Sequence, residues 1–159
     1  MTKSKSLSED TLFLQTLNVR KILDSPREER FDRVTKLAQR LLDAPVALFS
    51  LVDEDRIWFK SKHGLEIAQI PRTGALCDVV LQIGDILLLE DASQDERFRD
   101  TPAVTGELGV RFYAGCPVRG QDGSFHGTLC VLDTAPRKIS PDDIEILRDL
   151  GLMIEDALS

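Results

Sequence analysis

Cysteine, histidine and the larger aromatic side chains are scarce in this sequence of 159 residues. It contains three cysteines, two histidines, one tryptophan and one tyrosine. The cysteines are odd in number and none belongs to a Cys-x-x-Cys motif, which argues against a disulfide framework and a structural zinc site. Neither histidine has a second histidine or a carboxylate at ligand spacing, so we expect no metal site.

Long apolar runs and an excess of positive charge are also missing. No stretch of about 18 apolar residues exists, which argues against a transmembrane helix, and the polar start lacks the apolar segment of a signal peptide. The formal net charge is −7 and the pI is near 4.9, which disfavours nucleic acid and anionic membrane surfaces as partners. We therefore expect a cytoplasmic protein, with Lys60 and Lys62 on a solvated strand face.

The composition fits one globular domain. Hydrophobic residues make up 42% of the chain and charged residues 30%, as in ordinary soluble domains. Residues 1–8 are polar and are expected to form a disordered tail. Residues 9–159 are expected to form a single domain, without an internal repeat or a low-complexity linker.

Apolar spacing predicts three long helices. Two of them cover residues 9–23 and 28–42, and the apolar residues of the first spread over more than one face. Ser140 as N-cap, Pro141 at the first helical position and two aspartates after it predict a third helix that ends at Leu158.

The middle of the chain predicts strands. Residues 46–52 are almost continuously apolar, which is typical of a strand covered on both faces. Residues 56–62 follow as an amphipathic strand and residues 86–90 as another, whereas residues 64–71 are predicted to be a loop. A short helical piece is expected around Cys77.

The clearest hairpin joins residues 110–118 to residues 124–132. With a tight turn centred on Gln121 and Asp122, Tyr113 is expected opposite Cys130. One face then carries Phe112, Ala114, Cys116, Leu129 and Val131, and the other Tyr113, Gly115, Thr128, Cys130 and Leu132. Both faces are largely apolar, so both need cover.

Several motifs follow one another along the chain. They are APVAL at 44–48 with the residues to 61, residues 90–102, and, in the hairpin, RFYAGCPV at 111–118 and GTLCVLD at 127–133. In this order they resemble the first hairpin, the later connection and the terminal hairpin of the GAF domain family. The resemblance covers roughly Pro26 to Leu158. It is closest to bacterial sensory modules that precede GGDEF diguanylate cyclase or histidine kinase domains.

The resemblance implies an α+β, GAF/PAS-like fold. It has a central antiparallel sheet of about six strands, with terminal helices packed on one face and loops and short helices on the other. It implies no particular ligand, because function lies in the site and not in the fold. Relatives that carry bilin attach it through a cysteine followed by histidine, whereas none of the three cysteines here, Cys77, Cys116 and Cys130, is followed by histidine. The sequence motif of the relatives that bind cyclic nucleotides is also absent. The cofactor, if any, stays unknown.

Three functions compete. The leading hypothesis is a sensory module that binds a small molecule or a partner and relays the signal through its terminal helices to an output domain of GGDEF or kinase type, which this chain does not contain. The alternatives are a cysteine-dependent enzyme like the free methionine sulfoxide reductases and a ligand-free dimerisation module. We expect no enzyme, because no nucleophile–base arrangement is recognisable.

The ligand site is expected between the sheet and residues 74–82 and 91–111, which are charged and aperiodic. Core packing remains the alternative for each aromatic residue and cysteine, and a structural ion pair for the two charged residues. Cys77 is expected to be the most accessible cysteine. The candidate ligand-binding residues are Trp58, Cys77, Asp91, Phe98, Arg111 and Tyr113.

A parallel homodimer is also expected. The helices at 9–23 and 141–158 carry apolar residues beyond one stripe, and an uncovered row would drive association. In the last helix the first row is Ile144, Leu147, Ile154 and Leu158, and the second is Ile146, Leu150 and Met153. The alternative is that the two helices of one monomer cover each other.

Overall fold

The computed structural model describes residues 21–158, which are built on a six-stranded sheet with the order β3-β2-β1-β6-β5-β4. All neighbouring strands run antiparallel. The strands are β1 (Val46–Val52), β2 (Arg56–His63), β3 (Gln69–Pro71), β4 (Leu87–Leu89), β5 (Phe112–Arg119) and β6 (Phe125–Asp133). The expected fold class is confirmed, although β3 lies in a stretch that the sequence predicts as a loop.

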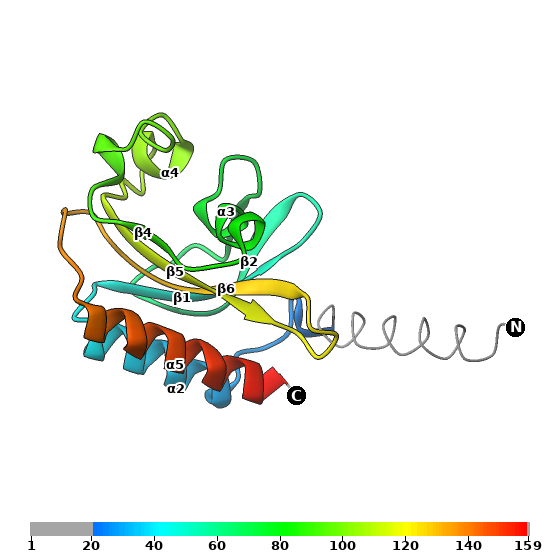
Figure 1. Ribbon diagram of the computed structural model, residues 1–159. Coiled ribbons are helices and arrows are strands. Elements are labelled where there is room, and N and C mark those ends of the chain that lie inside the picture. Colours follow the sequence, from blue (N-terminus) through cyan, green and yellow to red (C-terminus); the bar gives the residue numbers. More distant parts are fainter. Residues whose placement is uncertain (1–20, 159) are drawn as a thin grey trace, which may run out of the picture.

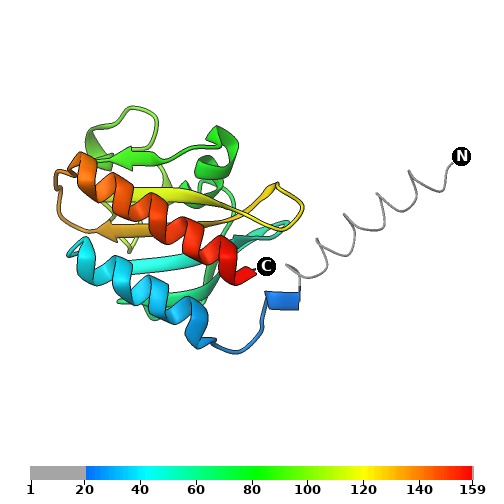
Figure 2. The same ribbon diagram turned by 60° about the horizontal axis from the view of Figure 1, so that its bottom comes forward.

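The two faces of the sheet carry different cover (Figure 1). Helices α2 (Glu29–Leu41) and α5 (Pro141–Leu158) lie on one face, side by side (Figure 2). The other face is covered by α3 (Leu76–Ile83), α4 (Pro102–Thr105), a 3-10 turn at Ala92–Gln94 and the loops between them. Of the helix predicted at 9–23, residues 9–20 lie outside the described residues, and Lys21 and Ile22 are helical.

The core between the helices and the sheet follows helical spacing. The inward residues of α2 are Phe31, Val34, Thr35 and Ala38, and those of α5 are Leu147, Leu150, Gly151 and Ile154. In α5, members of both predicted rows are therefore buried within one chain. The apolar side chains of α5 that are exposed are Leu152 and Met153, at 57% and 46%, so neither predicted row lies in solvent as a whole.

The helix start at Ser140 is confirmed. Its Oγ accepts the N–H of Asp143 at 3.1 Å, and the Asp143 carboxylate accepts the N–H of Ser140 at 3.3 Å. This reciprocal pair satisfies free donors at the beginning of α5.

The register of the β5–β6 hairpin differs by two residues from the prediction. Tyr113 pairs with Leu132 and Cys130 with Gly115. The turn has a three-residue loop with Gly123 at φ 82°, and a bulge between Val118 and Arg119 adds one more residue. An even shift keeps every side chain on its face, so the predicted faces are confirmed by the two cores that they enter.

Candidate functional site

A small apolar pocket opens on the α3–α4 side of the sheet, beside the edge strand β3. Its volume is about 240 Å³, below the roughly 300–1,000 Å³ of pockets for drug-sized ligands. One wall is β3 with the residues around it, and the other is α4 with the loop that follows. The lining residues are Ile67, Ile70, Pro71, Thr73, Gly74, Ala75, Pro102, Ala103, Glu107 and Leu108.

The two walls touch at Gly74. This residue has φ 75°, and a Cβ there would lie 2.9 Å from Cδ of Pro102. A side chain at this position is therefore excluded by backbone conformation and by contact. Thr73 and Glu107 provide polar groups in a lining that is otherwise apolar, which suits a small molecule with an apolar body and one polar end.

The pocket takes residues from both predicted segments, 74–82 and 91–111. All six candidate residues are among those described, yet none of them lines it. Cys77, Phe98 and Tyr113 are buried in the core on the pocket side of the sheet. Trp58 is buried in the core on the opposite, helix side. The six residues are therefore not brought together at one site.

The two charged candidate residues, Asp91 and Arg111, form hydrogen bonds with backbone groups. Asp91 accepts hydrogen bonds from the N–H and the hydroxyl of Ser93, at 3.1 and 2.6 Å, and so caps the 3-10 turn. Arg111 donates to the carbonyls of Val104 and Val110, at 3.2 and 3.0 Å. Arg111 thus ties α4, one wall of the pocket, to the start of β5.

The expected accessibility of Cys77 is wrong, because α3 turns this side chain down onto the sheet and leaves it 4% exposed. Thr128 Oγ1 donates to the Cys77 carbonyl at 3.2 Å, and the Tyr113 hydroxyl donates to its sulfur at 3.4 Å. The side chains of Cys130, Ser50 and Tyr113 stabilise the thiolate form and lower the pKa of Cys77 below its ordinary value. Burial raises the pKa of Tyr113 well above its ordinary value, so its hydroxyl stays protonated.

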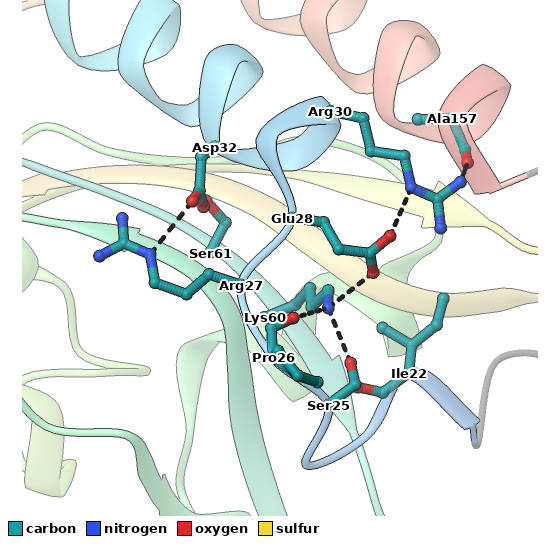
Figure 3. Close-up of polar contacts among 10 residues, drawn as sticks. All are labelled: Ile22, Ser25, Pro26, Arg27, Glu28, Arg30, Asp32, Lys60, Ser61 and Ala157. Carbon is teal, nitrogen blue, oxygen red and sulfur yellow. Dashed lines mark hydrogen bonds and ion pairs between the residues drawn. The ribbon is translucent and has the colours of Figure 1, made fainter.

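A second site, which is polar, lies on the helix side of the sheet, where the segment before α2 crosses β2 (Figure 3). The side chain of Lys60 is fully buried, and its Nζ donates to Ser25 Oγ at 2.7 Å and to the Pro26 carbonyl at 2.5 Å. Nζ also pairs with Glu28 at 2.7 Å. The expected solvated face is thus wrong for Lys60. We call this group, with Arg30, the Lys60 junction.

The Lys60 junction reaches the end of α5. Glu28 also pairs with Arg30 at 2.9 Å, and Arg30 donates to the carbonyl of Ala157 (Figure 3). Hydrogen bonds from Lys60 and Arg30 hold the pKa of Glu28 below its ordinary value. One buried lysine of the sheet is therefore connected through two side chains to the last turn of the C-terminal helix.

Arg56 fixes the same segment at a second point. Its guanidinium holds both carboxylate oxygens of Asp24, at 2.7 and 2.8 Å, and pairs with Asp53 at 3.1 Å. The bidentate geometry is the strong form of this interaction, and hydrogen bonding by Arg56 lowers the pKa of Asp24. Residues 24–28 are thus held to β2 by two basic side chains.

A β-bulge explains why sequence reasoning missed the junction. Phe49 pairs with Ser61 but Ser50 pairs with Phe59, so Lys60 is the extra residue on β2. Lys60 and Ser61 consequently both face the helices, and Ser61 binds Asp32 and Thr35 of α2. The available signal was the run Ile57-Trp58-Phe59, which breaks the alternation of an amphipathic strand just before the bulge.

Within residues 21–158, no group of three or more histidine, cysteine, aspartate or glutamate side chains could hold a metal ion. No helix within the same range has the length and apolar character needed to cross a membrane.

Comparison with known proteins gives the family. The family model described as "GAF domain" matches residues 26–158. A cyclic di-GMP phosphodiesterase of Pseudomonas aeruginosa is 34% identical over 134 residues, which are 84% of this chain and 23% of that protein. The chain thus spans under a quarter of that relative's length.

Solved structures agree on the fold. The GAF domain of an Acinetobacter phosphoenolpyruvate-protein phosphotransferase has a TM-score of 0.66 at 20% identity, over 91% of this chain and 92% of that one. The free methionine-R-sulfoxide reductase of Neisseria meningitidis has a TM-score of 0.66 at 17% identity, over 91% and 85%. The chain belongs to the GAF domain family, whose members are generally sensory and regulatory modules.

Proposed function

We propose that this GAF domain is a sensor in which a small, largely apolar molecule in the pocket beside β3 alters how the terminal segments are held. One observation carries the proposal: the pocket wall and the Lys60 junction share a pair of strands. In this pair Ile70 and Pro71, which line the pocket, are the register partners of Ile57 and Arg56 on β2. The same β2 holds residues 24–28 through Arg56 and Lys60.

The physical basis is the weakness of β3. It has three residues, lies at the edge of the sheet and pairs with β2, and short edge elements open at low free energy. A ligand that binds better when β3 is in place favours that arrangement by its difference in affinity. Because β3 pairs with β2, this change in equilibrium also alters how β2 is held, and through β2 it reaches the segment before α2 and the end of α5.

The test is an amide NMR titration of the full chain with indole as a small, largely apolar probe. We expect shifts at Ile70 and Ala103 in the pocket and at Glu28 and Lys60 in the junction. Ala103→Phe fills the pocket and should abolish the indole-induced shifts in the pocket and in the junction. Ile83→Phe is the control: it lies at an exposed position outside the pocket lining and should keep both sets of shifts. A lack of shifts in the pocket would refute the ligand site, and pocket shifts without junction shifts would refute the relay.

We propose that the chain has no enzymatic activity. Its three cysteines are all buried, whereas a catalytic thiolate needs access to its substrate. The burial of all three thiols counts in particular against a cysteine-dependent reductase. Turnover of free methionine sulfoxide that is lost on substitution of Cys77, Cys116 or Cys130 would contradict it.

A further inference from the structure

The outer edge of β3 is an unpaired strand edge beside the apolar pocket. Among the described strands, β3 is the last one on its side of the sheet. The carbonyl of Ala68 accepts a hydrogen bond from β2, and the N–H of Arg72 donates to the residue before β2, both at 3.0 Å. Backbone groups alternate in direction along a strand, so those of Ile70 also face β2. Those of Gln69 and Pro71, which are both exposed, point away from the sheet.

The proline in β3 agrees with this direction. A proline has no N–H, and within sheets it is confined to positions where that group would face away from a partner strand. The outer edge therefore offers one donor, the N–H of Gln69, and two acceptors, the carbonyls of Gln69 and Pro71. Such a row of free backbone groups is a template for an additional strand.

The side chains of β3 give its two faces different surroundings. Ile70 borders the apolar pocket, and its register partner Ile57 belongs to the pocket-side core. Gln69 pairs with Trp58 of the helix-side core, and its side chain accepts a hydrogen bond from Arg56 at 3.0 Å. A second hollow, of about 350 Å³, follows the same edge and is lined by Asp55, Arg56, Gln69, Ile70 and Pro71.

The charges at this edge are complementary to a basic partner. The charged side chains that line the pocket and the hollow are Glu107, Asp55 and Arg56. Arg56 is matched by the carboxylates of Asp24 and Asp53. Within residues 21–158, the unmatched charges of the lining are thus the exposed carboxylates of Asp55 and Glu107. Complementary charge favours encounter with a cationic partner and discriminates against an anionic one.

We propose that β3 binds an extended peptide of a partner protein, which adds an antiparallel strand and has the order basic, apolar, basic. The basic residue opposite Gln69 exchanges two backbone hydrogen bonds with it, and its side chain lies on the side of Arg56 and the hollow. The apolar residue opposite Ile70 enters the pocket, because opposite side chains share a face. The other basic residue donates its N–H to the carbonyl of Pro71. Pairing of this kind takes affinity from the main chain and specificity from alternate side chains.

The test is water-exchange NMR of the Gln69 amide in the full chain, titrated with the peptide acetyl-Thr-Lys-Val-Lys-Thr-amide. At saturation we expect exchange to slow by at least about tenfold, because a free N–H becomes hydrogen-bonded. The matching Glu-Val-Glu peptide should bind at least about fivefold more weakly, because its charges are repelled. The Lys-Gly-Lys peptide should also bind at least about fivefold more weakly, because it leaves the pocket empty.

Two substitutions at one position separate the backbone donor from the side chain. Gln69→Pro removes the outer N–H, and it should weaken binding of the Lys-Val-Lys peptide by at least about fivefold, followed by amide shifts at Ile70. Gln69→Ala is the matched control. It loses the same side chain but keeps the N–H, so we expect its affinity to stay within about twofold of the wild type.

Unchanged exchange at Gln69 in the presence of the Lys-Val-Lys peptide would overturn the proposal, and so would equal binding of the Lys and Glu peptides. Exchange that slows with chain concentration alone would mean that a second copy covers the edge, which also overturns it. The wild type decides the question even if Gln69→Pro does not fold. The proposal goes beyond the sensor function, because it gives the pocket a protein partner. Indole shifts without peptide binding would refute only the peptide, and the reverse would refute only the small-molecule sensor.

Discussion

On the helix face of the sheet, α2 and α5 bury a continuous set of apolar side chains, with Phe31 and Phe49 in contact at a ring-centroid distance of 5.2 Å. On the opposite face, short helices and loops cover a core that contains hydroxyls and two thiols and is bordered by a pocket. Long helices cover a sheet without gaps because each presents a continuous stripe. Short elements leave room for a ligand and for local opening, so we propose that the first face provides stability and the second face the sensing.

The largest expected difference between the faces comes from matched phenylalanine substitutions. Phe31→Ala, on the helix face, should lower the free energy of unfolding by about 3–5 kcal/mol, because two packed helices cannot collapse into the cavity. Phe98→Ala should cost less, because Phe98 lies in the loop between the 3-10 turn and α4, and short elements can move further into a cavity than two packed helices can. Urea unfolding of both variants tests this, and an equal or reversed order would break the comparison.

Two glycine substitutions compare how tightly side chains pack on the two faces of β5: Gly115 of β5 lies against Tyr113, and Gly151 of α5 lies against Cys116. Gly115→Ala should cost about 1–3 kcal/mol, because the new methyl group displaces the buried Tyr113 ring. Gly151→Ala, in α5, brings a methyl group 3.0 Å from Sγ of Cys116, and its helix propensity gain of up to about 1 kcal/mol opposes that contact. We expect the smaller loss at Gly151, measured by thermal unfolding. A greater loss at Gly151 would mean that the helix face is the less adaptable one at this strand.

Lys60→Met should lower the free energy of unfolding by about 1–3 kcal/mol, because the Pro26 carbonyl and the Ser25 hydroxyl lose a charged donor. Lys62→Met is the matched control. Lys62 is more solvent-accessible and donates to the carbonyls of Glu66 and Ile67, so its loss should stay within about 0.5 kcal/mol. Equal losses would mean that the buried junction contributes nothing beyond a surface lysine.

The Lys60→Met effect should also depend on pH. The Lys60 hydrogen bond is the main cause that holds the pKa of Glu28 below its ordinary value of 4.5. As the pH falls, Glu28 of the unfolded chain therefore binds a proton before Glu28 of the folded protein does. The stabilisation is complete above about pH 4.5, and it is lost as the pH drops through the lower pKa of Glu28 in the folded protein. Urea midpoints from about pH 6 to about pH 3 should show the wild type and Lys60→Met converging. A constant difference would exclude the Glu28 pair as its source.

The smallest expected effect on stability is at the outer surface of the helices. We propose that the chain forms a homodimer through this surface, where Leu37, Leu41, Leu152 and Met153 are exposed. Leu152→Asp should change the free energy of unfolding by less than about 0.5 kcal/mol at low protein concentration, but should shift sedimentation towards the monomer. A wild-type monomer at micromolar concentration, unchanged by Leu152→Asp, would rule out this dimer.

The sequence alone determined the elements whose pattern is local. Helical spacing and the Ser140 cap identified α2 and α5, and alternation identified the hairpin faces even with the wrong register, because a shift of two residues preserves the face of each side chain. The motifs also gave the family. These features depend on neighbours within one or two turns or along one strand, so composition and spacing are enough to predict them.

Tertiary structure decided the positions that depend on distant partners. The bulge at Lys60 forms because β1 and β2 pair out of step there, and it turns a lysine expected in solvent towards Ser25 and Glu28. Cys77 is buried because α3 docks on β6, which no local pattern of α3 requires. Strand β3 exists through its pairing with β2, and three residues are too few to show a period. The pocket depends on that strand, and so only the folded chain defines its walls.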